Sequence, residues 1–172
     1  MKFSVSVGEI MTSAVQTIDM NDTVEKAAKI MKENNIGSVV VMGEKNVKGI
    51  ITSSDIVNKY VAERKGDLVK DIMSGEIVKI SPGKTIEDAA RLMVAKKIKK
   101  LLVFDKERFV GVITATDVLR VEPELLEVLL ERMKAGGRRP EGVEFSECEV
   151  CGNYSDDVEE VNGMYTCSEC RE

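Results

Sequence analysis

The chain has 172 residues, of which 43% are apolar and 32% charged, and its formal net charge is −5. This composition is typical of a globular, soluble protein and excludes a disordered chain. No segment approaches the roughly 20 apolar residues of a membrane span, and the first residues lack the apolar core of a signal peptide, so we expect a cytoplasmic protein. The absence of histidine excludes imidazole-based catalysis and histidine metal ligands.

An internal repeat with a period of 62 residues spans about two thirds of the chain. Residues 9–58 align with residues 71–120 without a gap, and 14 of these 50 positions are identical. The shared features are an Ile-Met pair, a Thr-x-Glu-x-Ala-Ala segment and a Gly-apolar-Ile-Thr-x-x-Asp tract. A register kept over this length indicates a duplication, and we place the repeats at 1–60 and 61–121.

Each repeat predicts the element order β-α-β-β-α. Apolar residues spaced at i, i+3, i+4 and i+7 predict amphipathic helices that begin near Val24 and Ile86. Short apolar runs predict strands at 15–18, 39–41 and 47–51 in the first repeat and at 77–80, 101–103 and 109–113 in the second. Because these runs are continuous, we expect strands that are buried on both faces. A second helix is expected to start at Asp55 and at Asp117.

A further helix and a linker are predicted within 122–140. Pro123 stands near the helix start, acidic residues fill its first turn, and Gly136-Gly137 follow its end. The leucines of this helix form an apolar stripe, which either docks on the repeats or forms a dimer surface; the sequence leaves both interpretations open. The run Gly-Gly-Arg-Arg-Pro at 136–140 predicts a linker.

The last 32 residues, 141–172, differ from the rest of the chain in charge and in cysteine content. Residues 1–140 carry 24 basic and 20 acidic side chains, a net of +4, whereas 141–172 carry one basic and ten acidic, a net of −9. Two Cys-x2-Cys pairs separated by 15 residues have the spacing of a structural zinc site. Asn162-Gly163 predicts a β-hairpin between the pairs. The predicted metal ligands are Cys148, Cys151, Cys167 and Cys170.

Two other interpretations of these cysteines are less well supported by the sequence. Two disulfides would also use all four, but nothing in the sequence indicates secretion. A redox pair would require a βαβ context that the segment lacks. A piece of 32 residues with almost no apolar core needs metal binding to supply much of its folding free energy, which favours a metal site.

The shared tract, GIITSSD at 49–55 and GVITATD at 111–117, predicts a turn from a strand into a helix. A threonine hydroxyl and an aspartate carboxylate then lie beside a helix N-terminus. Helix N-termini attract phosphate, and a carboxylate can accept hydrogen bonds from the two hydroxyls of a ribose. The alternative is that the threonine and the aspartate only cap the helix.

Residues 7–121 resemble a tandem pair of CBS domains, a Bateman module. The resemblance rests on the Ile-Met pair, the Thr-x-Glu-x-Ala-Ala helix start and, most specifically, both Thr-x-x-Asp tracts. It implies a mixed α/β fold in which two β-α-β-β-α repeats pack as a pseudo-twofold pair, with a small β zinc ribbon added here. It also implies that AMP, ADP, ATP or a related adenosyl ligand binds in clefts between the repeats.

In that family the aspartate holds the ribose, the Thr or Ser hydroxyl lies near ribose or phosphate, and the first strand of the partner repeat lines the adenine. Carried over to this chain, the first site comprises Thr52, Ser53, Ser54, Asp55, Ser74, Ile77, Val78, Lys99 and Lys100. The second comprises Thr12, Val15, Gln16, Gly37, Ser38, Thr114, Ala115, Thr116 and Asp117. Because the family often places a basic residue where Lys99 and Lys100 stand, we expect the Asp55 site to bind nucleotide more tightly.

The cysteine segment resembles a zinc ribbon and, more loosely, the rubredoxin knuckle. Four thiolates accept zinc or iron. Arg171 stands where rubredoxin-like knuckles usually have glycine, and their prolines are missing, which favours zinc over iron. Many ribbons bind nucleic acid, but a net charge of −9 repels phosphate and makes nucleic-acid binding by this segment unfavourable.

The sequence thus predicts a non-enzymatic regulatory protein that binds an adenosyl ligand, forms a homodimer and uses its ribbon to contact an unknown protein partner. Ligand binding would shift the packing of the two repeats. Two alternatives belong to other functional classes. One is a nucleic-acid-binding or transcription-associated adaptor that its CBS pair dimerises, and the other is a rubredoxin-like iron protein.

Overall fold

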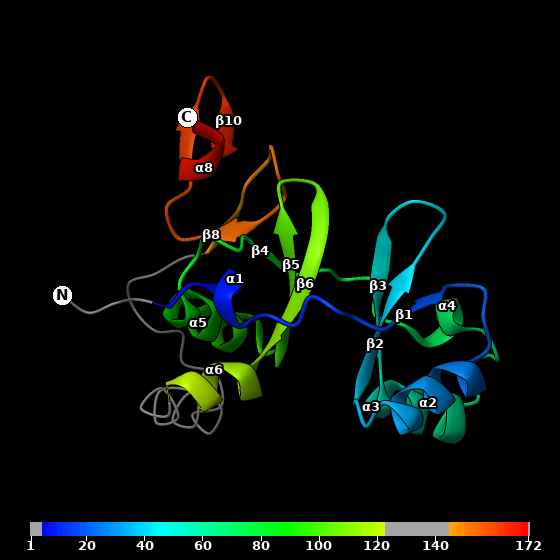
Figure 1. Cartoon of the computed structure of the whole chain (residues 1–172). Coiled ribbons are helices and arrows are strands. Elements are labelled where there is room, and N and C mark those ends of the chain that lie inside the picture. Colours follow the sequence, from blue (N-terminus) through cyan, green and yellow to red (C-terminus); the bar gives the residue numbers. More distant parts are fainter. Residues whose placement is uncertain (1–4, 123–144, 172) are drawn as a thin grey trace. The chain divides into compact units, whose positions relative to one another are not determined.

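The computed structural model describes residues 5–122 and 145–171, which form two compact units. Residues 14–77 make up one, here the Asp55 unit, and residues 1–13 with 78–172 make up the other, the Asp117 unit (Figure 1). The segment that precedes each repeat therefore belongs to the compact unit of the other repeat. The repeat boundaries at 60 and 121 stay predictions, and the predicted helix and linker at 122–140 lie outside the described residues except for Glu122.

The Asp55 unit contains a three-stranded sheet and its helices. The strands are β1 (Thr17–Asp19), β2 (Ser38–Met42) and β3 (Val47–Thr52), and the helices are α2 (Val24–Glu33), α3 (Ser53–Asp55), the π-helix η1 (Ile56–Ala62) and α4 (Val69–Ile72). Strand β2 lies between β1, to which it is parallel, and β3, to which it is antiparallel. The apolar faces of α2 and of the sheet share one core, which includes Val24, Met31 and Val39.

The Asp117 unit repeats this arrangement. Its strands are β4 (Lys79–Ile80), β5 (Lys100–Asp105) and β6 (Arg108–Thr114), and its helices are α1 (Val7–Ile10), α5 (Ile86–Lys96) and α6 (Ala115–Val121). The strand order β4-β5-β6 and the parallel and antiparallel pairings match those of the other unit. The central strands β2 and β5 are almost continuously buried, as their unbroken apolar runs predict.

The predicted mixed α/β fold and the β-α-β-β-α order are confirmed, but the predicted start of the second helix is wrong. The helices begin at Ser53 and Ala115, two residues before the aspartates. Thr52 and Thr114 are the N-cap residues, and each aspartate occupies the third helical position. The difference arises because the threonine and the aspartate cap the helix together: the threonine precedes the first helical residue and the aspartate is the third.

The last 27 described residues form small β-hairpins. Strand β7 (Ser146–Glu147) pairs with β8 (Tyr154–Ser155), β9 (Glu159–Val161) pairs with β10 (Met164–Thr166), and α8 (Ser168–Arg171) follows. Both turn residues of the second hairpin have positive φ, 53° at Asn162 and 81° at Gly163. This conformation is what the Asn-Gly pair predicts, and the predicted hairpin is confirmed.

Among the described residues, no helix has the length and apolar character needed to cross a membrane.

The glycine of each shared tract lies against a neighbouring backbone. In the Asp55 unit, Ile50 and Ser74 exchange two backbone hydrogen bonds, and a Cβ added at Gly49 would lie 2.1 Å from the Ser74 carbonyl oxygen. In the Asp117 unit, Val112 and Thr12 exchange the same pair of bonds, and a Cβ at Gly111 would lie 2.8 Å from the Thr12 oxygen. Glycine is therefore required at both positions because a neighbouring backbone segment leaves no room for a Cβ atom, and not because of an unusual φ angle.

Replacing either glycine by alanine is expected to destabilise the protein, Gly49→Ala more than Gly111→Ala, because the added methyl group overlaps a fixed carbonyl more deeply at position 49. The expected loss is about 2–3 kcal/mol for Gly49→Ala, at the upper end of the usual cost of overpacking. Urea-induced unfolding followed by circular dichroism measures the difference. Gly75→Ala is the comparison without a steric clash, since its added Cβ would meet only the Lys48 carbonyl oxygen, at an ordinary contact distance of 3.9 Å. Equal stability of Gly49→Ala and the unmodified chain would contradict the proposed role of the contact.

Candidate functional site: a four-cysteine cluster and two Thr-x-x-Asp turns

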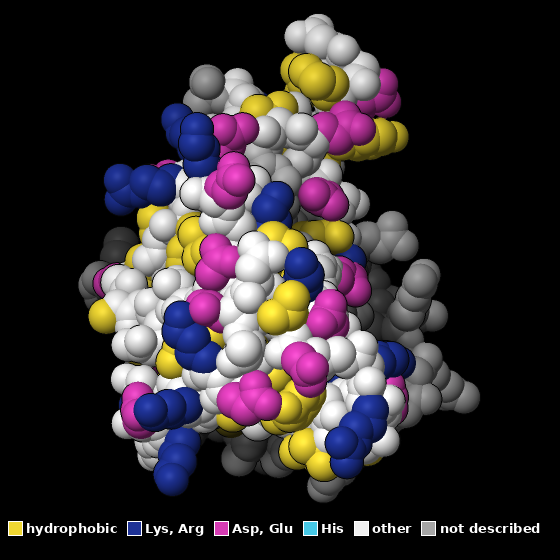
Figure 2. All heavy atoms as spheres, turned by 90° about the vertical axis from the view of Figure 1, so that its right-hand side faces the viewer, with side chains coloured by type: hydrophobic (Ala, Val, Ile, Leu, Met, Phe, Trp, Pro, Cys, Tyr) yellow, Lys and Arg dark blue, Asp and Glu magenta, His cyan; other side chains and the backbone are white. Residues whose placement is uncertain are grey.

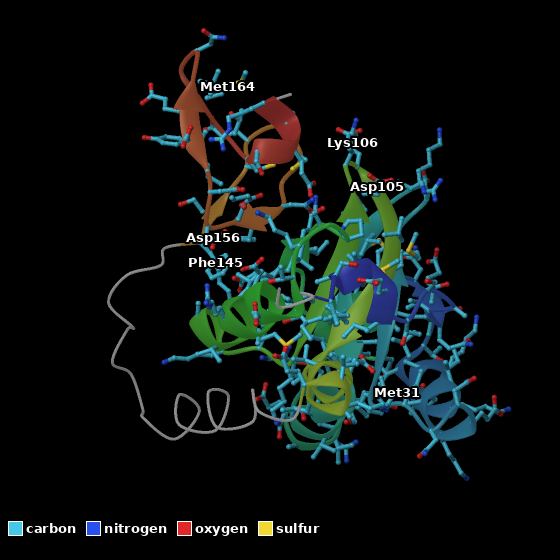
Figure 3. All side chains as sticks on the ribbon, turned by 60° about the vertical axis from the view of Figure 1, so that its left-hand side comes forward. Met31, Asp105, Lys106, Phe145, Asp156 and Met164 are labelled. Carbon is cyan, nitrogen blue, oxygen red and sulfur yellow. The ribbon has the colours of Figure 1, made fainter. Side chains whose placement is uncertain are left out.

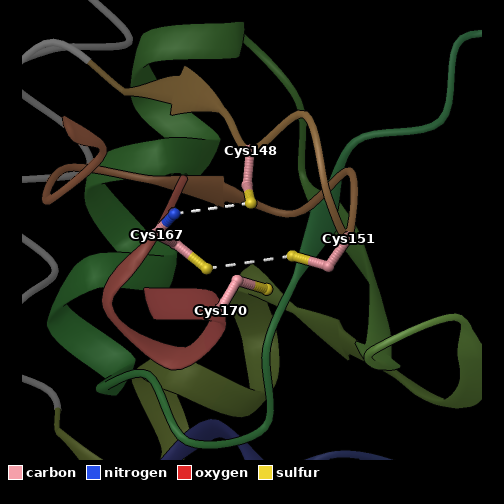
Figure 4. A group of neighbouring side chains, drawn as sticks. All are labelled: Cys148, Cys151, Cys167 and Cys170. Carbon is pink, nitrogen blue, oxygen red and sulfur yellow. Dashed lines mark hydrogen bonds between the residues drawn. The ribbon is translucent and has the colours of Figure 1, made fainter. Parts of the chain in front are cut away.

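The four cysteines lie together at the two Cys-x2-Cys turns (Figure 4). Their sulfur atoms are all within 4.8 Å of one another, and Cys151 Sγ is 3.8 Å from Cys167 Sγ. A tetrahedral site with metal–sulfur bonds of about 2.3 Å places its sulfurs about 3.8 Å apart, so the arrangement fits a metal ion. All four are free thiols, which argues against the disulfide interpretation.

The electrostatics of the cluster also suit a cation. Burial opposes ionisation of Cys148, but backbone N–H groups, that of Cys167 among them at 3.4 Å, outweigh it and lower the pKa of this thiol to about 6. Burial and the neighbouring cysteines raise the pKa of Cys170 to about 11 and also raise the pKa of Cys151. One thiolate is therefore stabilised by the backbone while further thiolates are disfavoured, and a divalent cation among the sulfurs relieves that repulsion.

The second Cys-x2-Cys turn, at 167–170, and the loop before β9 contact the turn that connects β4 with α5. Lys84 Nζ lies 3.0 Å from Asp157 Oδ2, and the lysine side chain is only 15% exposed. Asp157 also accepts a 2.6 Å hydrogen bond from Ser168 Oγ, next to Cys167. Ser81 Oγ, which is buried, donates to Glu169 Oε1 at 2.7 Å. The side chains that lie between Cys167 and Cys170 thus contact the second repeat directly or through Asp157.

The first cysteine turn has contacts of its own with the second repeat. Asn153 is buried; its carbonyl accepts from Cys148 N–H, while its side-chain amide donates to the Phe104 carbonyl at 3.2 Å. Lys96 Nζ lies 4.0 Å from the centre of the Tyr154 ring, a cation–π contact. Sequence reasoning missed these docking residues, because the only available signal was an excess of acidic residues that is equally consistent with an exposed surface.

The far end of the ribbon carries apolar side chains that make no such contacts. Met164 lies in the β9–β10 hairpin (Figure 3), and Met164, Tyr165 and Val161 are all exposed. The same hairpin contains two exposed acidic residues of β9, Glu159 and Glu160.

The two Thr-x-x-Asp turns have the same internal geometry. Thr52 N–H and Oγ1–H donate to Asp55 Oδ2 at 3.0 and 2.6 Å, and Asp55 N–H donates back to Thr52 Oγ1 at 3.1 Å. The corresponding distances between Thr114 and Asp117 are 2.9, 2.7 and 3.3 Å. Each pair is therefore a capping box, which confirms that these residues cap their helices and leaves their predicted role in ligand binding a prediction. In each box the cap uses Oδ2 and leaves Oδ1 for another partner.

The structure groups the other predicted ligand residues by unit. In the Asp55 unit, Ser53 N–H donates to the Gly37 carbonyl at 3.0 Å, Ser38 pairs with Thr52, and Ser74 pairs with Ile50. This unit also holds Val15, Gln16, Ser54 and Ile77.

In the Asp117 unit, Ala115 N–H donates to the Lys99 carbonyl at 2.9 Å, Lys100 pairs with Thr114, and Thr12 pairs with Val112. This unit also holds Thr116 and Val78, whose side chain is buried in the core. Burial, reinforced by the charge of Lys99, lowers the pKa of Lys100. Each predicted ligand site draws on residues of both units, so both sites stay predictions.

Comparison with known proteins adds to these observations. The family model described as "CBS domain" matches the chain twice, at residues 7–62 and 69–124. The chain belongs to the CBS domain family. An uncharacterized protein of Methanopyrus kandleri is 37% identical over 180 aligned positions, which cover 98% of this chain and 92% of that protein.

Two solved structures of CBS proteins are similar in fold. A CBS domain pair in complex with 5′-methylthioadenosine and S-adenosyl-L-methionine has a TM-score of 0.64 at 25% identity, covering 70% of this chain and 98% of that one. A hexameric CBS-CP12 protein from bloom-forming cyanobacteria has a TM-score of 0.63 at 30% identity, covering 73% of this chain and 71% of that one. Relatives of this chain thus bind adenosyl ligands and form oligomers.

The chain is expected to bind one metal ion, and Cys151→Ser to lose it, because a serine hydroxyl does not replace a thiolate ligand. Elemental analysis of the purified protein measures the metal content, and titration of free thiols before and after chelation shows whether the cysteines hold it. Since the ligands must be deprotonated, the metal is expected to dissociate as the pH falls. Ser146→Ala, an exposed neighbour, is the control and should keep the metal. A metal content that does not change in Cys151→Ser would contradict the assignment.

Lys84→Met is expected to destabilise the docked ribbon by about 1–3 kcal/mol at neutral pH, because it leaves the Asp157 carboxylate without its ammonium partner. Lys26→Met removes the exposed pair with Asp22 and should cost less than about 0.5 kcal/mol. Hydrogen bonds from Ser155, Ser168 and Lys84 outweigh burial and lower the pKa of Asp157.

The Lys84–Asp157 contribution is therefore complete above the carboxyl pKa of about 3.9 in the unfolded chain, and it is lost as the pH falls further. Thermal unfolding of both variants between pH 7 and pH 3 measures this, with the metal content determined at each pH so that loss of the metal is separated from loss of the ion pair. A Lys84→Met effect that does not decrease on acidification would show that the ion pair is not its cause.

Proposed function

We propose that this chain is a regulatory protein that binds an adenosyl ligand through its two Thr-x-x-Asp turns. The observation that carries the proposal is the division of labour between the two carboxylate oxygens in each capping box: Oδ2 holds the turn, and Oδ1, which the cap does not use, is the oxygen proposed to accept hydrogen bonds from a ribose. A matched pair of such turns supports a ligand with vicinal hydroxyls. The CBS domain pair solved with 5′-methylthioadenosine and S-adenosyl-L-methionine supports an adenosyl group.

Basic and small residues beside the turns suit the rest of such a ligand. Lys100 is half-buried next to Thr114, and among the described residues no carboxylate lies within ion-pair distance of it. A half-buried ammonium without a counter-ion favours an anionic partner such as a phosphate or carboxylate group. The preferred ligand is accordingly AMP, ADP, ATP or S-adenosylmethionine.

The ribbon is proposed to hold zinc and to act as a protein-binding module. Its four thiolates suit zinc, and its acidic surface does not suit nucleic acid. On the face drawn in Figure 2, Lys and Arg side chains are interspersed with Asp and Glu side chains, without the basic patch that a nucleic-acid backbone requires. An iron-loaded cluster would instead give the purified protein a visible absorption band.

A binding role is proposed in place of an enzymatic one. The threonine and aspartate side chains of both turns direct their hydrogen bonds to each other, an arrangement that fixes geometry and does not activate a nucleophile. A homodimer is also proposed, supported by the oligomer that a related CBS protein forms.

Calorimetric titration with AMP, ATP, S-adenosylmethionine and 5′-methylthioadenosine tests the proposal. The unmodified chain is expected to bind at least one of them, and the double variant Asp55→Asn, Asp117→Asn to bind it at least about tenfold more weakly, because a hydrogen bond to a charged group contributes about 1.5–3 kcal/mol. Asparagine is chosen because its carbonyl can still complete the cap.

Asp105→Asn, an exposed residue of the β5–β6 hairpin, is the control (Figure 3). If no adenosyl compound binds, or if the double variant binds as tightly as the unmodified chain, the proposed function is wrong.

A further inference from the structure

The two capping boxes differ in what occupies Oδ1, the oxygen that the cap leaves unused. In the Asp55 unit, Lys59 Nζ lies 2.8 Å from Asp55 Oδ1. In the Asp117 unit, the cation nearest to Asp117 Oδ1 among residues 5–122 and 145–171 is Arg120, whose Nη1 is 3.8 Å away and whose side chain is 73% exposed. The first distance is that of a strong charge-assisted hydrogen bond, and the second is that of a loose surface pair.

Lys59 is held in place by a second contact. Its Nζ also donates to the Ile72 carbonyl, the last residue of α4, at 2.8 Å. The Lys59 side chain is 29% exposed and that of Asp55 14%, so the pair is largely removed from water. Hydrogen bonds from Lys59 and Thr52 outweigh the effect of burial and lower the pKa of Asp55. The ammonium therefore joins η1, α4 and the aspartate in one bridge.

The internal repeat shows that this bridge is specific to one copy. With the period of 62 residues, Lys59 corresponds to Val121 and Ile72 corresponds to Ile10. Valine cannot donate to a carboxylate, so the Asp117 unit cannot form the bridge. The helices differ as well: the segment after Asp55 is a π-helix, whereas the segment after Asp117 is an α-helix. π-Helices are rare and occur frequently at functional sites.

We propose that Lys59 competes with the ribose for Asp55, so that an adenosyl ligand binds first at Asp117 and binds at Asp55 only when the Lys59 bridge opens. This inference rests on the proposed function. It reverses the order of affinity that Lys99 and Lys100 predict, because that prediction took no account of a cation already bound to Asp55. Lys59 is thus a residue that makes two similar sites unequal.

Opening the bridge also releases α4 from η1, since one ammonium holds both. A ligand at Asp55 must supply hydrogen bonds to the carboxylate and leave the Ile72 carbonyl to water or to another donor. Binding at this turn is therefore linked to a local rearrangement, whereas binding at Asp117 is not. The Asp117 site is therefore filled at a low ligand concentration, and the Asp55 site is filled only at a higher one.

The test exchanges residues between the repeats. Full-length protein and three variants, Lys59→Met, Val121→Lys and the control Lys29→Met, are titrated with AMP and with S-adenosylmethionine by calorimetry. Lys29 is exposed, and its ion pair within the described part of the chain is a loose one with Glu33 at 4.0 Å.

The unmodified chain and the control are expected to bind one equivalent tightly and a second about tenfold more weakly, the factor expected from a hydrogen bond to a charged group. Lys59→Met is expected to strengthen the second event about tenfold, and Val121→Lys to weaken the first by a similar factor.

Thermal unfolding verifies that each variant is folded. If Lys59→Met is not, Lys59→Gln takes its place, since its amide can still donate to the Ile72 carbonyl without carrying a charge. If the unmodified chain binds ligand but removal of the Lys59 charge leaves the second event unchanged, or weakens it as loss of a phosphate contact would, the inference is wrong and the proposed function stands. If no protein in the series binds either compound, the proposed function is wrong, and the inference fails with it.

Discussion

The reciprocal hydrogen bonds between a threonine and an aspartate are the interaction on which each unit depends. They fix the direction in which the chain leaves the third strand of the sheet and enters the following helix. Two donors of the threonine converge on a single carboxylate oxygen, Oδ2, in both repeats. The same arrangement leaves the second oxygen in a defined position at the turn. Helix capping and the proposed ligand binding are therefore compatible explanations of these residues, because the cap uses one oxygen and the proposed ligand contact uses the other.

The four-cysteine cluster, if it holds the proposed metal, has a comparable double role in the C-terminal segment. Ser168 and Glu169, which lie between Cys167 and Cys170, and Asn153, which follows Cys151, make or support the contacts with the second repeat. A segment of this size has too little apolar core to hold these side chains in place by packing alone. The geometry imposed by a metal ion would position the docking residues, so metal binding and docking are energetically linked. The ribbon would then be an integral part of the Asp117 unit and not a freely tethered appendage.

The sequence predicts the elements of the fold better than their tertiary partners. The 62-residue period, the buried strands and the Asn162-Gly163 turn follow from local patterns, and the structure has all of them. Local patterns do not predict that the segment before each repeat joins the unit of the other repeat. These segments contain α1 and α4, which are one-turn helices whose partners lie more than 60 residues away or in another repeat. Lys84 and Ser81 show no signal either, since an isolated lysine or serine in a turn looks like any exposed residue until its partner is known.

Comparison of the two repeats identifies a difference between the two turns that neither repeat reveals alone. A duplication begins with two identical turns. Each later substitution near one of them makes the properties of the two turns differ. At the capping box nothing differs: threonine, aspartate and all three hydrogen bonds are kept. One helical turn later, lysine stands in one repeat and valine in the other, and only the lysine reaches the carboxylate. The position that separates the two turns is therefore outside the shared tract, where a search for the motif would not look for it.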